Sequence, residues 1–94
     1  MKVENSSLKI FLTNGVTLTV KDDEEIKNID NMEMDLVELS TLIENALEDK
    51  EPLEFWAKIK HPYKNEKGKE EVQEVEHYYY VPYEKISWYM IEEV

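Results

Sequence analysis

The sequence predicts an α+β fold: one amphipathic helix packed on a mostly antiparallel sheet of about five strands, in the order β-β-α-β-β-β. Three observations lead to this prediction. Residues 35–50 have a helical hydrophobic period, residues 8–20 read as a hairpin, and alternating patterns of the strand type follow residue 53. We expect residues 1–94 to form a single small acidic domain, because 94 residues build one core and no second module.

Residues 35–50 carry the clearest signal of any segment. Their apolar residues recur on one stripe of a 3.6-residue period, and polar residues occupy the opposite side. Asp35 is positioned to cap the free N–H groups of the first turn, and Glu38 to bond back to it as in a capping box. Pro52 is expected to end the helix. The apolar stripe consists of Leu36, Leu39, Ile43, Ala46 and Leu47, with Leu42 at its edge.

The hairpin at residues 8–20 has two conceivable registers around Thr13-Asn14-Gly15. A two-residue Asn-Gly loop would divide the apolar residues between the two faces. A three-residue loop with Gly15 in the left-handed conformation places all six on one face, so we predict this register. The predicted pairs are Leu12 with Val16, Ile10 with Leu18, and Leu8 with Val20, with Phe11 on the other face opposite Thr17.

The remaining segments are a charged connector and three strands. The connector, residues 21–34, is expected to hold a short helix after Asp23. Alternation predicts a strand from residue 53 that ends near His61-Pro62, then a polar loop at residues 65–68 and a strand over residues 72–81. The last strand, residues 86–94, is apolar on both faces, which predicts a central position in the sheet or cover on both sides.

Negative charge is concentrated in one part of the chain, which we call the acidic block. Residues 22–54 contain 13 acids and only two lysines, so they carry the whole net charge of −11, and the other residues balance. All 11 basic residues are lysines, so no bidentate guanidinium is available for phosphate or guanine. We therefore expect no direct contact with nucleic acid and none with a membrane.

The acidic block is a candidate surface for a protein partner. We expect it to bind a basic nucleic-acid-binding protein, with carboxylates in the positions of phosphates. The simpler interpretation is that these acids are solvated surface and only keep the protein soluble. The candidate acids are Asp22, Asp23, Glu24, Glu25, Glu38, Glu44, Glu48 and Asp49.

Aromatic residues are concentrated in the second half of the chain, where nine of the ten follow residue 54. A strand turns alternate side chains to opposite faces, so neighbouring tyrosines cannot all face the helix. A second face rich in rings is a candidate for a homodimer or a foreign protein. The alternative is cross-strand packing that only stiffens the sheet. The candidate residues are Trp56, Tyr78, Tyr80, Trp88 and Tyr89.

No motif for catalysis or nucleotide binding is present, and the chain has no cysteine and only two glycines. The only imidazoles, His61 and His77, would lie nearly opposite each other if residues 59–63 paired with residues 75–79. Two histidines and flexible carboxylates are a weak ligand set for zinc, and two sheet histidines beside tyrosines are the simpler interpretation. We therefore expect a non-enzymatic protein without catalytic residues, metal or cofactor.

The sequence also indicates where in the cell the protein is located. No apolar run approaches the length of a membrane span, and the first residues lack the layout of a signal peptide. Zero cysteines are consistent with a reducing compartment. We expect a cytoplasmic protein.

The closing stretch from about Tyr78 to Glu92, YYYVPYEKISWYMIE, consists of a strand, a bend with proline, an isolated isoleucine and another strand. It resembles the end of Sm-like and other small β-barrels. Sm-like proteins bind RNA, and their helix normally precedes the first strand. Together with the opening hairpin it also resembles short accessory proteins of Gram-positive bacteria and their phages. This second resemblance implies an accessory role, or the inhibition of a host nuclease by a DNA mimic. The alternative is a homodimeric accessory or structural protein that associates through its aromatic face.

Overall fold

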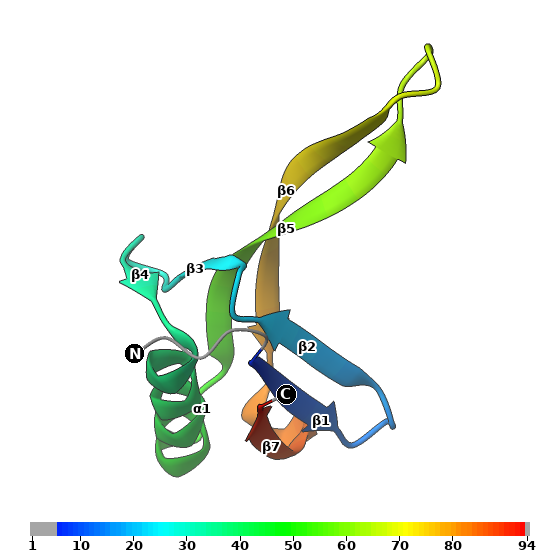
Figure 1. Ribbon diagram of the computed structural model, residues 1–94. Helices are drawn as coiled ribbons and strands as arrows, with labels where there is room; N and C mark the ends of the chain where they lie inside the picture. The colour runs from blue at the N-terminus through cyan, green and yellow to red at the C-terminus, as the bar shows by residue number, and fades with distance from the viewer. Residues whose placement is uncertain (1–5, 94) are drawn as a thin grey trace.

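The computed structural model describes residues 6–93, which form one α-helix, one short 3-10 helix and seven strands. The expected α+β class with a single helix is confirmed. The strands form two sheets, in the orders β2-β1-β7 and β4-β3-β5-β6, and every pairing is antiparallel (Figure 1). The elements are β1 (Ser7–Leu12), β2 (Thr17–Lys21), β3 (Glu25–Lys27), β4 (Glu33–Met34), α1 (Leu36–Asp49), β5 (Leu53–Lys64), β6 (Glu70–Val81), η1 (Tyr83–Lys85) and β7 (Ile86–Glu92).

The hairpin of β1 and β2 has the predicted register. Leu8 pairs with Val20, Ile10 with Leu18, and Phe11 with Thr17. The loop closes as expected, because Gly15 has a φ of 87° and the amide of Leu12 donates to the carbonyl of Val16 at 2.9 Å. Leu8, Ile10 and Val20 of the face that selected this register are buried, while Val16 beside the loop is 48% exposed.

Helix α1 begins and ends close to the predicted residues. A carboxylate oxygen of Asp35 accepts a hydrogen bond from the amide of Glu38 at 2.7 Å, which is the expected cap. The helix stops at Lys50, whose φ of 56° is left-handed and whose amide donates to the carbonyl of Ala46. Pro52 follows two residues later and could not continue the helix, so the predicted end before Pro52 is confirmed.

The connector contains strands where a short helix was expected after Asp23. β3 and β4 form a small hairpin, in which Ile26 faces Met34 on one side and Ala57 of β5 on the other. Asn28 builds the turn, since its side-chain oxygen accepts hydrogen bonds from the amides of Asp30 and Met32. The prediction of a helix was wrong, because this segment pairs with β5 and buries Ile26 there.

Strands β5 and β6 form a long hairpin that extends beyond the rest of the molecule (Figure 1), and we call its outer part, residues 59–75, the arm. β5 was expected to end near His61-Pro62 but continues to Lys64. β3 pairs with β5 only as far as Lys58, so beyond it one edge of β5 is free and tolerates a proline that has no N–H. The polar loop is confirmed as a turn, in which Gly68 has a φ of 76°.

The core lies between the helix and the inner faces of both sheets. Phe55 of β5 is fully buried, and its ring stacks on Tyr79 of β6 with 4.7 Å between centroids. As expected, the neighbouring tyrosines of β6 do not all face the helix, because Tyr79 and Val81 pack here while Tyr78 and Tyr80 are exposed. The buried apolar residues are Leu8, Ile10, Val20, Ile26, Leu36, Leu39, Ile43, Ala46, Leu53, Phe55, Ala57, Val81 and Ile86.

Strand β7 is an edge strand, which contradicts the expected central or doubly covered position. Its pairing with β1 shifts register between Phe11 and Leu12, so Ile86 and Tyr89 both face inward. Trp88 faces outward, where its ring stacks on Phe11 with 4.1 Å between centroids. The apolar outer face of β7 is therefore covered by one neighbouring ring and not by a layer of the fold.

Candidate interaction surfaces

Acids from two separate segments meet around one pocket of about 180 Å³. The turn between β2 and β3 contributes one group, and the junction of β4 with α1 contributes Glu33 and Asp35. Glu33 and Asp35 were not among the predicted candidate acids, because only the β3–β4 hairpin brings them to the others. The pocket is lined by Asp22, Glu24, Glu25, Ile26, Glu33, Met34, Asp35 and Leu36.

Glu24 is the least solvated acid of this group. Its Oε2 atom is buried and has no hydrogen-bond partner among residues 6–93. Burial raises the pKa of the Glu24 carboxyl above its usual value, and the nearby charge of Asp23 acts in the same direction. Glu24 therefore contributes charge to the pocket at a cost to the stability of the fold.

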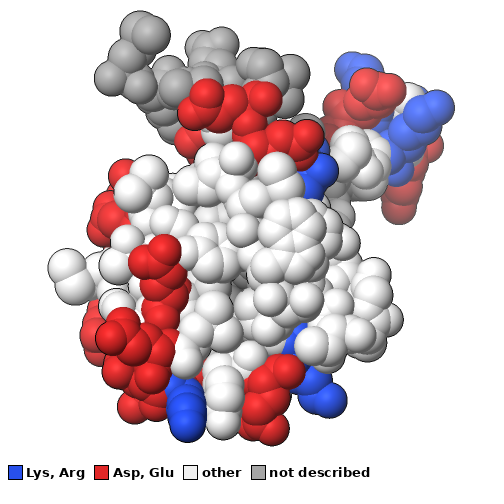
Figure 2. Space-filling model, turned by 90° about the horizontal axis from the view of Figure 1, so that it is seen from below, with Lys and Arg blue, Asp and Glu red and all other residues white. Residues whose placement is uncertain are grey.

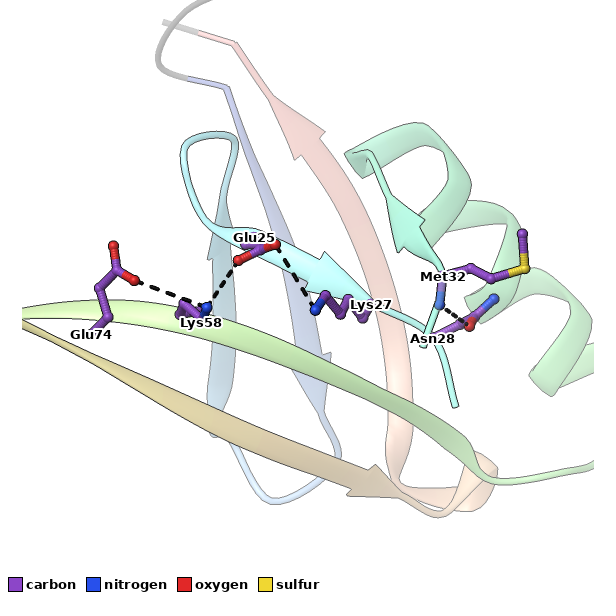
Figure 3. Close-up of polar contacts among 6 residues, drawn as sticks. All are labelled: Glu25, Lys27, Asn28, Met32, Lys58 and Glu74. Carbon is purple, nitrogen blue, oxygen red and sulfur yellow. Dashed lines mark hydrogen bonds and ion pairs between the residues drawn. The ribbon is translucent and has the colours of Figure 1, made fainter. Parts of the chain in front are cut away.

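Glu25 is partly neutralised by a lysine of β5. The Nζ atom of Lys58 lies 3.2 Å from a Glu25 carboxylate oxygen and 4.0 Å from one of Glu74, so it stands between the two acids (Figure 3). The hydrogen bond from Lys58 lowers the pKa of Glu25 and raises the pKa of Lys58. The negative charge of Glu25 is therefore partly compensated by the positive charge of Lys58.

All four candidate acids of the helix are exposed. Glu38, Glu48 and Asp49 are exposed and form no ion pair with any residue from 6 to 93. Glu44 is different, because it accepts a hydrogen bond from the hydroxyl of Tyr89. Glu48 and Asp49 lie in the last turn, which has no basic residue, and there the helix dipole disfavours negative charge.

Most of the candidate acids belong to elements that are neighbours in the fold. β3, β4 and α1 lie together at one side of the ribbon, away from the tip of the arm (Figure 1). In the view from below, acidic side chains lie around the rim of a broad central area without charged side chains (Figure 2). We call the pocket acids Asp22, Glu24, Glu25, Glu33 and Asp35, together with Glu38, Glu48 and Asp49 of the helix, the acidic surface.

Three of the five candidate aromatic residues form a group on the outer face of β5 and β6. Trp56, Tyr78 and Tyr80 have exposed fractions of 37%, 45% and 58%. The rings of Trp56 and Tyr78 are in contact, with centroids 4.8 Å apart. The hydroxyl of Tyr78 donates to Glu54, and this bond raises the pKa of Tyr78. We call these three residues the aromatic group.

The other two candidates lie in the three-stranded sheet. Trp88 is 52% exposed and stacks on Phe11, whose place on the outer face of its hairpin was predicted. Tyr89 is half-buried against the core and bonded to Glu44. A single five-residue aromatic face is therefore not present.

The two histidines meet, although not through the expected pairing. Ile59 pairs with Val75, but Tyr63 pairs with Glu71, so His61 lies opposite Gln73 and His77 opposite Ala57. Both side chains are on the same face of the hairpin, and their Nε2 atoms are 3.4 Å apart. No group of three or more His, Cys, Asp or Glu residues within 6–93 is arranged to hold a metal ion.

Comparisons with models of protein families, with curated proteins and with solved structures found no match for this chain. In the described part of the chain, α1 is too short and too polar to span a bilayer.

Proposed function

We propose that the protein is a non-enzymatic binding module whose acidic surface occupies the basic, nucleic-acid-binding surface of another protein. The observation that supports this most is the pocket at which acids from the β2–β3 turn meet Glu33 and Asp35 at the start of α1. Carboxylates held close together on rigid elements resemble the row of phosphates that a basic groove accepts, and they attract such a groove over a distance.

Charge balance within the fold supports the same proposal. Among the described acids of the surface, Glu25 is partly neutralised by Lys58, while Glu38, Glu48 and Asp49 have no cationic partner there. Clustered like charges and acids at a helix C-terminus lower the stability of a fold. These acids lie at positions where they lower the stability of the fold. Such positions are better explained by selection for binding a partner than by selection for folding.

A role as a cytoplasmic inhibitor of a nuclease or repair enzyme follows from this mechanism. A basic groove filled by carboxylates is closed to DNA, so the module inhibits by competition and needs no chemistry of its own. The resemblance to small accessory proteins of phages and Gram-positive bacteria points to the same class.

The proposal is tested by capture from a bacterial extract at low salt with two matched triple variants. Glu38→Lys/Glu48→Lys/Asp49→Lys reverses charge on the acidic surface. Glu66→Lys/Glu84→Lys/Glu93→Lys makes the same change in net charge at three exposed acids elsewhere. We expect a nucleic-acid-binding protein to be captured by the wild type and by the second variant and to be lost with the first. Added duplex DNA should release it.

Two results would contradict the proposal. One is equal capture by both variants, which would place the contact away from the acidic surface. The other is capture that duplex DNA does not reverse, because carboxylates in the positions of phosphates must compete with phosphates.

A second candidate function is self-association through the aromatic group. Exposed Trp and Tyr side chains in contact are typical anchors of protein interfaces. Light scattering at high salt should then give twice the chain mass of 11.2 kDa for the wild type and the single mass for Trp56→Ala. A monomer at all protein concentrations would exclude this candidate.

A further inference from the structure

We propose that His61 and His77 form a two-histidine chelate for a divalent transition metal ion of the zinc class, at the base of the arm. The inference does not depend on the proposed function, because the histidines belong to neither the acidic surface nor the aromatic group. It departs from the expectation of no metal, which was based on the small number of imidazoles and on the flexibility of the carboxylates beside them.

The hairpin brings the two side chains together over one residue pair. Ile59 and Val75 lie opposite each other between the histidines, and His61 and His77 extend along the same face from either side. The two rings are tilted by 40°, and each turns its Nε2 atom toward the other. Both strands are paired throughout this region, so the backbone holds the two ligands at a fixed separation.

The separation of the nitrogen atoms fits tetrahedral coordination. With Zn–N bonds of roughly 2.0–2.1 Å, two ligands of a tetrahedral ion lie about 3.3–3.4 Å apart. The observed distance between the Nε2 atoms is 3.4 Å. Adjacent ligands of a square-planar ion with similar bonds would lie about 2.8–3.0 Å apart, so the pair favours a tetrahedral ion.

Only a small movement would direct both lone pairs at one ion. The ring centroids are now 5.6 Å apart, and a tetrahedral chelate requires about 5.2 Å. His61 is exposed and His77 is half-buried, so rotation about their side-chain bonds can supply this change. Without metal, the same contact is a hydrogen bond in which one Nε2–H donates to the other Nε2.

The surroundings favour a cation at this position. The carboxylate of Glu24 interacts electrostatically with His77, and the chain as a whole is strongly acidic. Two ligands leave two positions of a tetrahedral ion for water or a further ligand. A site with open positions on an exposed hairpin binds and releases metal readily, in contrast to a closed structural site.

The test is a titration of the full chain with ZnCl2 near pH 7.5. His61→Ala, His77→Ala and the double variant are compared with the wild type by calorimetry and by 15N spectra of the imidazoles. We expect one ion per chain, and a Kd about 10-fold or more weaker in each single variant, because even loss of an outer-shell partner costs roughly 10–100-fold. The double variant should bind no more weakly than either single one, since one imidazole alone does not chelate.

Mg²⁺ is the matched control, because it prefers oxygen ligands and should leave the imidazole signals unchanged. The wild-type spectra require no variant, and Zn²⁺ should shift both imidazoles together at one equivalent. The proposal is overturned if only one imidazole shifts, if the wild type and the double variant bind Zn²⁺ equally, or if the Kd lies above about 1 mM.

Discussion

The hydroxyl of Tyr89 donates a hydrogen bond to Glu44 and so ties the last strand to the only α-helix in the described chain. The two residues are 45 positions apart in sequence. Tyr89 also packs on the core, so it joins the three-stranded sheet to α1. Tyr89 was a candidate for the aromatic partner face and Glu44 for the acidic one. Both side chains are instead used in a contact within the fold.

Tyr89→Phe should lower the free energy of unfolding by about 0.5–1.5 kcal/mol, the usual net contribution of a hydrogen bond. Urea unfolding measures this change. Glu44→Gln is the companion variant, and the double variant should be less destabilised than the sum of the single ones. Strict additivity would show that the bond contributes nothing.

The same contact predicts an alkaline dependence of stability. Burial, followed by the bond to Glu44, raises the pKa of Tyr89 to about 12, above the usual value near 10. The folded state therefore keeps a proton that the unfolded state loses, so this contribution is complete below about pH 10 and is lost as the pH rises to about 12. Urea unfolding should show the wild type losing its advantage over Tyr89→Phe in this interval. An advantage that stays constant would contradict the assignment.

Glu24→Gln should stabilise the protein at neutral pH by about 0.5–1 kcal/mol, a value reduced from that of a fully buried group because Glu24 is partly exposed. Burial raises the folded pKa of Glu24 above 4.5, so wild-type stability falls as the pH rises from about 4.5 through the folded pKa. The gain should vanish at acidic pH, where Glu24 is protonated in both states. Unfolding curves at pH 4 and pH 7 test this.

Glu25→Gln is the control with the opposite sign. Lys58 lowers the pKa of Glu25, so its contribution is present above pH 4.5 and is lost as the pH falls through the folded pKa. This variant should be less stable than the wild type at neutral pH. A gain from both substitutions would mean that general repulsion, and not the two local environments, determines stability here.

Asp35→Ala should cost about 1 kcal/mol of stability, because the amide of Glu38 loses its acceptor at the start of α1. Asp30→Ala removes an equal charge from the nearby exposed turn and is the control. Thermal unfolding should separate the two variants. Equal effects would show that charge, and not the cap, accounts for the change.

The sequence predicted those elements that are determined by residues within the element itself. The register around Gly15 and the cap at Asp35 are such cases, because one buried face and one side chain decide them. The strand at Ile26 could not be predicted in this way, since its pairing with Ala57 joins segments about thirty residues apart. The same applies to the site, where Glu33 joins the pocket only through the β3–β4 hairpin.

The most direct test of the acidic surface is the Kd for the captured partner, measured at about 50 mM and about 500 mM salt, across which the screening length shortens roughly threefold. We predict that wild-type affinity falls steeply with salt, and that Glu38→Lys/Glu48→Lys/Asp49→Lys binds weakly at both concentrations. An affinity that is the same at both salt concentrations and in both proteins would show that the carboxylates take no part in binding.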